Sequence, residues 1–128
     1  MKKIFLVFIV FLSFLDFSYG QSEAIWMRYP AISPDGNSIV FSYKGDLWKI
    51  PTEGGLATPM TLHEGHDFQP VWSNDGKQIA FASQRYGNFD VYIMPSSGGK
   101  ADRLTYHSSG DYPSSFAPDN KSVLFYFK

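Results

Sequence analysis

Residues 72–83, WSNDGKQIAFAS, decide the fold because they combine a turn with a strand that has no polar face. Asn74-Asp75-Gly76 is a turn signal, since glycine adopts the positive φ with which such a turn ends. The strand QIAFAS does not alternate between apolar and polar residues, as a strand with one face in water does. Other parts of the protein must therefore cover both of its faces.

The same phrase occurs three times along the chain. It reads ISPDGNSIVFSY from residue 32 and FAPDNKSVLFYF from residue 116, so Asp35, Asp75 and Asp119 are spaced 40 and 44 residues apart. The residue after each aspartate tolerates a positive φ; these residues are Gly36, Gly76 and Asn120. Sheets of successive repeats that stack face to face would cover both faces of each apolar strand.

Each repeat is long enough for four short strands. Residues 46–68 align with residues 90–112 without a gap, and turn signals divide the second copy into QPVWS, QIAFAS, DVYIMP and ADRLT. Four strands in about 40 to 45 residues are typical of a β-propeller blade. We expect structural roles at the turn and repeat positions Asp35, Gly36, Asp67, Trp72, Asp75, Gly76, Asp90 and Asp111.

The sequence therefore predicts an all-β protein made of β-propeller blades of four antiparallel strands, with essentially no helix after Gly20. The first blade spans about 26–68, the second about 69–112, and the third begins over about 113–128, which makes about two and a half blades. A parallel β-helix has shorter coils, and an immunoglobulin-like sandwich would not require a repeat. Closed propellers have about four to eight blades, so we expect an N-terminal part of a longer protein. The alternative is a small protein that closes its propeller as a homo-oligomer.

Residues 1–20 have the layout of a secretory signal peptide, and residues 21–128 are the expected mature part. Lys2 and Lys3 precede the apolar run IFLVFIVFLSFL, and the small residues Ser18 and Gly20 precede a cleavage site before Gln21. Asp16 ends this run short of the ~20 residues that span a bilayer. We expect an exported protein, periplasmic or extracellular, that is not held in the membrane after cleavage.

Composition and motifs argue against a nucleic-acid, metal, cofactor or catalytic site in this chain. The net charge is −1 and the basic residues are scattered, so the sequence has no basic patch of the kind that binds nucleic acid. The chain contains no cysteine, which excludes disulfides, thiolate metal ligands and cysteine nucleophiles. His63 and His66 lie three apart in a turn-rich loop, whereas the zinc-binding helix motif needs a spacing of four. His63 and Asp67 also recur as His107 and Asp111, which indicates a structural role. We expect no metal, no cofactor and no catalytic residue.

The second repeat contains a four-residue insertion centred on Arg85-Tyr86-Gly87-Asn88. Loops on a rigid scaffold often carry recognition, and arginine and tyrosine are favoured at interfaces. Arg85, Tyr86 and Asn88 are therefore candidates for contact with a peptide or protein. The alternative for Arg85 is an internal bond to an adjacent turn carboxylate.

Residues 70–105, PVWSNDGKQIAFASQRYGNFDVYIMPSSGGKADRLT, resemble the repeat of the Tol-type and tricorn-type propellers. Its pattern is proline, an aromatic residue, Ser-Pro-Asp-Gly, an apolar strand, an arginine loop, an aspartate-led strand, Gly-Gly and Leu-Thr. The phrase MRYPAISPDG, shortly after a signal peptide, is similar to the start of exported tricorn protease homologues, and the resemblance extends over about 24–128.

The resemblance implies a non-catalytic propeller that admits or filters peptide substrates for a serine peptidase domain elsewhere in the parent chain. The implied partners are peptide or protein substrates, reached through the propeller channel or loops, together with the remaining blades and the peptidase domain. Two other kinds of parent protein are alternatives. One is a Tol-like propeller that docks envelope proteins, and the other is the propeller of a prolyl-oligopeptidase-like hydrolase.

Overall fold

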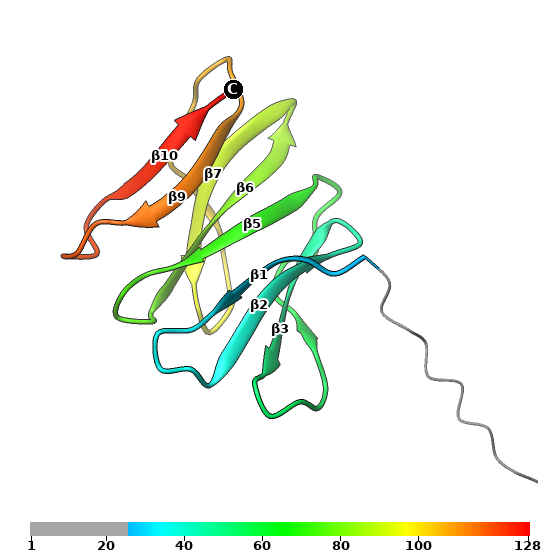
Figure 1. Ribbon diagram of the computed structural model, residues 1–128. Helices are drawn as coiled ribbons and strands as arrows, with labels where there is room; N and C mark the ends of the chain where they lie inside the picture. The colour runs from blue at the N-terminus through cyan, green and yellow to red at the C-terminus, as the bar shows by residue number, and fades with distance from the viewer. Residues whose placement is uncertain (1–25) are drawn as a thin grey trace, which may run out of the picture.

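Ten strands in three antiparallel sheets make up residues 26–128, the part of the chain that the computed structural model describes (Figure 1). The predicted signal peptide lies outside these residues. No helix occurs between residues 26 and 128, which confirms the all-β prediction. A search of the same residues for a helix long and apolar enough to cross a membrane finds none.

Each sheet follows chain order, as in a propeller blade. The first contains β1 (Arg28–Ile32), β2 (Ser38–Tyr43), β3 (Asp46–Pro51) and β4 (Thr58–Pro59). The second contains β5 (Asp67–Trp72), β6 (Gln78–Tyr86), β7 (Asn88–Pro95) and β8 (Asp102–Arg103). The third pairs β9 (Asp111–Phe116) with β10 (Val123–Phe127). Blades of four antiparallel strands, two complete and one begun, were predicted and are confirmed.

The ends of the blades differ in detail from the sequence prediction. β5 and β9 begin at Asp67 and Asp111, slightly before the approximate blade boundaries. The outer strands β4 and β8 contain only two residues each, although ADRLT suggested a longer strand. Very short outer strands present few unpaired backbone groups at the sheet edge, which limits edge-to-edge association.

The first strands of the three sheets are neighbours in space. β5 contacts β1 on one side and β9 on the other, and the three sheets lie side by side (Figure 1). This arrangement places β1, β5 and β9 along the inner side of the array, where a propeller has its axis.

The strand β6 is covered on both faces, as its apolar sequence predicted. Phe81 belongs to a buried cluster with Val40 and Leu47 of the first sheet. Ala80, which points to the opposite face, belongs to a second cluster with Phe116 of the third sheet. Stacking of successive sheets therefore buries residues Ile79–Ser83 of this strand, and a fully buried phenylalanine contributes roughly 1.5–3 kcal/mol.

The turn before β6 is closed by side chains. The Ser73 hydroxyl donates to Asp75 Oδ1 at 2.7 Å, and the Lys77 N–H donates to the same oxygen at 3.1 Å. These hydrogen bonds, the serine bond first, lower the pKa of Asp75 below its usual value. Gly76 then adopts φ 71°, as the sequence predicted.

The other two copies build the same turn with one difference. Asp35 accepts from the Ser33 hydroxyl at 2.5 Å, which with the Asn37 N–H lowers its pKa, and Gly36 has φ 76°. In the third copy Ala117 replaces the serine, and Asn120 takes the positive φ at 59°. The backbone turn therefore survives without the serine.

Hydrogen bonds also join neighbouring blades. Trp72 Nε1 donates to the Ala31 carbonyl of the first blade at 2.9 Å. Asn74 Nδ2 donates to the Ala117 carbonyl of the third blade at 2.9 Å. The tryptophan of the repeat thus links the second sheet to the first.

Candidate functional site

One end of the sheets carries the insertion at residues 85–88, the segment that the sequence marked for recognition. The β2–β3 and β6–β7 turns and the β4–β5 and β8–β9 connections meet there, because consecutive strands run in opposite directions. We call this end the loop face. Arg85, Tyr86 and Asn88 all lie on it, in or beside the β6–β7 turn.

Arg85 points into the protein. Its Nη2 lies 3.0 Å from Asp67 Oδ2, its Nε donates to the Ser83 hydroxyl at 3.0 Å, and its guanidinium lies over the ring of Tyr92. The Arg85 side chain is 15% exposed and that of Asp67 is 0% exposed. Arg85 therefore forms an internal ion pair. Its partner Asp67 begins β5, whereas the alternative considered from the sequence was a carboxylate in an adjacent turn.

Tyr86 and Tyr106 are the exposed part of the loop face near this ion pair. They are 70% and 73% exposed, and the Arg103 guanidinium lies over both rings, 5.0 and 4.4 Å from their centroids. A hollow of about 370 Å³ lies among these residues, Arg85 and Tyr92. Sequence reasoning missed Arg103, because its counterpart in the first repeat is Pro59 and no recurring signal marks it.

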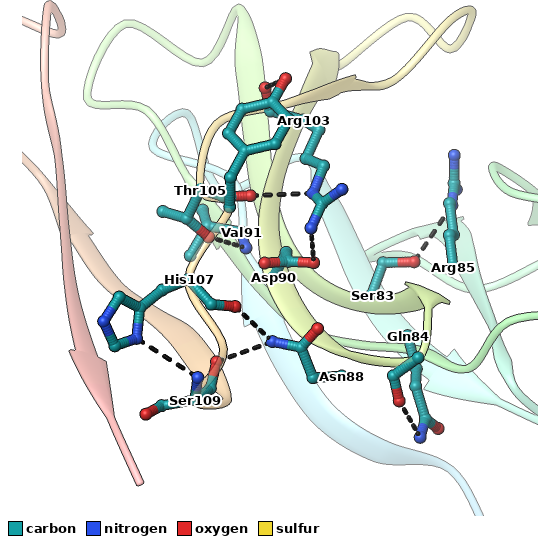
Figure 2. A network of polar contacts seen from close by, with 12 residues as sticks. Ser83, Gln84, Arg85, Asn88, Asp90, Val91, Arg103, Thr105, His107 and Ser109 are labelled. Atoms are coloured by element: carbon teal, nitrogen blue, oxygen red, sulfur yellow. Dashed lines mark hydrogen bonds and ion pairs between the residues drawn. The ribbon is translucent and has the colours of Figure 1, made fainter.

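Asn88 fixes the connection between β8 and β9. Its Nδ2 donates to the carbonyls of His107 and Ser109 at 2.7 and 2.8 Å (Figure 2). The Ser109 N–H donates to His107 Nδ1 at 3.2 Å, and His63 Nδ1 accepts from Gly65 N–H at 2.9 Å in the preceding connection. Both histidines therefore close the inter-blade connection, in agreement with their predicted structural role.

Three buried aspartates lie beneath the loop face: Asp67, Asp90 and Asp111. Asp90 Oδ2 forms an ion pair with Arg103 Nη2 at 2.7 Å (Figure 2). Burial nevertheless raises the pKa of Asp90, because desolvation outweighs the attraction of Arg103 and the negative charge of Asp111 adds to the effect. Asp111 Oδ2 is buried without a hydrogen-bond partner in residues 26–128.

A continuous row of aromatic rings crosses the loop face from the first blade to the third. We call Tyr29, Phe68, Phe89, Tyr112 and Tyr126 the aromatic row. Successive ring centroids are 5.2, 4.9, 5.7 and 5.4 Å apart. Sequence reasoning missed the row, although Phe68 and Tyr112 occupy equivalent positions after the aspartates of the repeat. The other three rings have no such signal.

Two inner strands bulge where the row crosses them. Tyr29 and Gln69 occupy equivalent positions, each precedes a proline, and their φ angles are 53° and 55°. Positive φ is uncommon outside glycine and persists only where surrounding contacts hold it. Gln69 Nε2 donates to the Pro113 carbonyl of the third blade at 2.8 Å. The bulges therefore direct side chains of one blade toward the next.

The loop face combines internal ion pairs with partly exposed rings. Among residues 26–128, no three His, Cys, Asp or Glu side chains lie close enough together to hold a metal ion. The charged groups Arg85, Asp67, Arg103 and Asp90 are paired within the protein. Flat, partly exposed rings on a rigid frame are suited to non-covalent contact with apolar side chains and peptide planes.

Curated relatives match parts of the chain. It is 33% identical over 69 residues to the uncharacterized peptidase YuxL of Bacillus subtilis, covering 46% of this chain and 10% of that protein. It is 34% identical over 58 residues to the TolB homolog of Chlorobium luteolum, covering 44% of this chain and 13% of that protein. The chain thus spans only a small part of the length of either relative.

Solved structures share the fold. The putative TolB of Agrobacterium tumefaciens superposes with a TM-score of 0.75 at 26% identity, over 84% of this chain and 40% of that one. The tricorn protease superposes with a TM-score of 0.61 at 18% identity, over 77% of this chain and 11% of that one. Residues 24–128 match the family of tricorn protease N-terminal beta propeller domains, and the chain belongs to this family.

Proposed function

We propose that these blades are a non-catalytic propeller segment of an exported tricorn-like serine peptidase, and that they admit or hold peptide substrates for its peptidase domain. The aromatic row carries this proposal. It spans all three blades on one face, and its end members Tyr29 and Tyr126 are exposed. Peptides from unfolded proteins present apolar and aromatic side chains that stack on such rings.

The rigidity of the layer beneath supports the same function. The ion pairs Arg85–Asp67 and Arg103–Asp90 hold the β6–β7 turn and the outer strand β8 in place. A platform that is already ordered loses little conformational entropy when a ligand binds. The row can then bind many peptide sequences, because stacking depends on ring surface more than on a particular hydrogen-bond pattern.

Affinity for an unfolded peptide tests the proposal. The probe is a fluorescently labelled casein-derived peptide, measured by anisotropy against the full chain and against Tyr29→Ala. Loss of one stacking ring is expected to weaken binding about two- to tenfold. Tyr106→Ala is the matched control, because Tyr106 is an exposed tyrosine outside the row. Equal affinities of wild type and Tyr29→Ala, or a larger loss in Tyr106→Ala, would contradict the proposal.

A Tol-like binding module is the second candidate, favoured by the superposition on a putative TolB structure at 26% identity. Such a module would dock a folded envelope protein. The folded partner of such a module would compete poorly with unfolded peptides for the aromatic row. Tyr29→Ala would then leave peptide affinity unchanged. The anisotropy experiment therefore separates the two functions.

Export belongs to the proposal as well, and it rests on the signal-peptide layout of residues 1–20. Expression of the full chain in a Gram-negative host should give a periplasmic product whose N-terminal residue is Gln21. An unprocessed N-terminus at Met1 in the cytoplasmic fraction would contradict export.

A further inference from the structure

A cleft lies between the first and second blades, beside the outer strand β8. Two adjoining hollows of about 370 and 240 Å³ form it, and both are lined by His63, Arg85 and Lys100. His63 comes from the β4–β5 connection of the first blade, and Lys100 comes from the β7–β8 connection of the second. The four-stranded sheets of the first two blades therefore supply both walls of the cleft.

The hydroxyl of Tyr92 is buried at the larger hollow without a partner. Tyr92 is 3% exposed and lines this hollow, and its hydroxyl makes no hydrogen bond with any group in residues 26–128. The Arg85 guanidinium lies 5.0 Å from the centroid of the Tyr92 ring, and a guanidinium can only donate hydrogen bonds. A buried hydroxyl left unpaired is costly, so its proton calls for an acceptor.

Other groups around the hollow also have hydrogen-bond donors to spare. Arg85 and Arg103 bind their internal partners through Nε and Nη2, and no hydrogen bond within the described chain uses the Nη1 group of either one. His63 Nδ1 accepts from the Gly65 N–H, so the proton of the neutral ring is on Nε2. These donors need an acceptor that the two blades do not supply.

The carboxylates near the hollow are already engaged. Asp102 is the one carboxylate among the residues that line the larger hollow, and Lys100 Nζ lies 2.8 Å from its Oδ1. Asp67 and Asp90 are buried behind the two arginines and paired with them. An incoming oxyanion therefore meets free donors in a site whose own charges balance. A carboxylate with one negative charge suits such a site better than a phosphate, because the buried aspartates repel a second charge.

We propose that this cleft binds a glutamate or aspartate side chain of a peptide. The peptide carboxylate accepts hydrogen bonds from the Tyr92 hydroxyl and from Nη1 of Arg85. The neighbouring part of the peptide lies in the smaller hollow against Leu62, which is 81% exposed, and Tyr106 does not line this hollow. The site is separate from the aromatic row, and it does not depend on the function proposed for that row.

The test compares two acetylated and amidated peptides, ALELA and ALQLA, in which a side chain is the only place for a carboxylate. Binding to the full chain is followed by NMR titration of the Arg85 Nε–H signal. Replacing glutamate by glutamine is expected to weaken binding about tenfold, because a charge-assisted hydrogen bond is lost. A third peptide with phosphoserine in the central position should bind no more tightly than ALELA. Equal affinities for ALELA and ALQLA, or tighter binding of the phosphoserine peptide, would overturn the proposal.

The protein side of the contact is tested by Tyr92→Phe, which removes only the hydroxyl. The variant should unfold at the same denaturant concentration or a higher one, because the hydroxyl has no partner within residues 26–128. It should weaken binding of ALELA about three- to tenfold and leave binding of ALQLA unchanged. Tyr29→Phe is the matched control, since it removes a tyrosine hydroxyl outside the cleft, and it should change neither affinity. Equal losses for both peptides in Tyr92→Phe would reveal a purely structural effect and contradict the proposal.

The variant used for the aromatic row keeps the two proposals apart. Tyr29→Ala should leave the difference between ALELA and ALQLA unchanged, whatever it does to the affinity for the casein-derived peptide. Loss of that difference in Tyr29→Ala would contradict a separate site in the cleft.

Discussion

At the scale of single residues, the loop face depends on arginines that neutralise buried aspartates. Arg85 and Asp67 are both largely removed from water, and their ion pair is supported by Ser83 and by the ring of Tyr92. Breaking such a pair from one side leaves a buried charge without a counter-ion, whereas replacing both partners by apolar residues removes the cost. The pair therefore fixes the position of the β6–β7 turn more than it adds net stability.

Arg85→Ala is expected to lower the free energy of unfolding by about 3–5 kcal/mol, because Asp67 is left uncompensated. Lys100→Ala, which breaks the exposed pair Lys100–Asp102, should change it by less than about 1 kcal/mol. Urea unfolding followed by tryptophan fluorescence measures both. The double variant Arg85→Met with Asp67→Leu should regain most of the loss, and a double variant as unstable as Arg85→Ala would argue against the charge mechanism.

The carboxyl groups of Asp75 and Asp90 should titrate on opposite sides of the usual aspartate value of 3.8. Hydrogen bonds from Ser73 and Lys77 lower the pKa of Asp75 in the folded protein, so its stabilisation is present above 3.8 and is lost as pH falls through the lower folded value. Carbonyl-detected NMR titration measures this directly. In Ser73→Ala the Asp75 pKa should move back toward 3.8, and no movement would exclude the serine as the main cause.

The pKa shift of Asp90, and with it the effect of Asp90 on the pH dependence of stability, has the opposite sign. Burial raises its folded pKa, so its ionised form costs stability above that value, and the cost is relieved as pH falls toward 3.8. In Asp111→Asn the Asp90 pKa should decrease, because a neighbouring negative charge is removed. The same NMR titration tests this, and an unchanged Asp90 pKa would show that the two carboxylates do not interact.

At the scale of strands, β6 and β10 share one apolar sequence pattern but lie in different environments. Both come from the apolar second segment of the repeat, but β6 is buried on both faces and most of β10 is exposed. The apolar pattern predicted the covering sheets of β6 correctly, because burial of both faces is a local requirement of the strand.

Phe81→Ala in β6 should lower the free energy of unfolding by about 3–5 kcal/mol, because it opens a cavity between the first two sheets. Phe125→Ala in β10 removes a ring that is already exposed and should cost about 1 kcal/mol or less. Chemical denaturation compares the two variants. Similar losses in both would mean that β10 is covered in solution.

The sequence predicted the features that local chemistry determines. Turns at Asp35-Gly36 and Asp75-Gly76 follow from side-chain hydrogen bonds and positive φ, and the repeat indicated how many strands form each blade. The pairing of Arg85 with Asp67 and the aromatic row depend on residues from different strands. Phe89 joins that row through Phe68 of its own sheet and Tyr112 of the next, and Tyr126 joins it through Tyr112 on the paired strand, so no spacing in the sequence marks them.

At the scale of the whole molecule, the three sheets present two different surfaces for contact. The aromatic row crosses the loop face near the ion pairs Arg85–Asp67 and Arg103–Asp90, and β10, which pairs with β9 alone among residues 26–128, carries exposed apolar side chains. Strand edges with exposed apolar side chains promote association between copies of a chain.

The full chain is expected to self-associate through β10 as its concentration rises. Leu124→Lys places a charge on this edge and should shift sedimentation toward the monomer. Leu62→Lys, at an exposed position in the β4–β5 connection, is the control and should leave the distribution unchanged. A monomeric wild-type protein at all concentrations would show that β10 does not mediate association.

The most direct test of the central claim, that the loop face of these blades holds peptides, is an NMR titration of the aromatic side chains with an unfolded, casein-derived peptide. We expect saturable shifts at Tyr29, Phe68, Phe89, Tyr112 and Tyr126, with little change at Tyr106. Shifts confined to β10, or no saturable shift in the aromatic row, would contradict it.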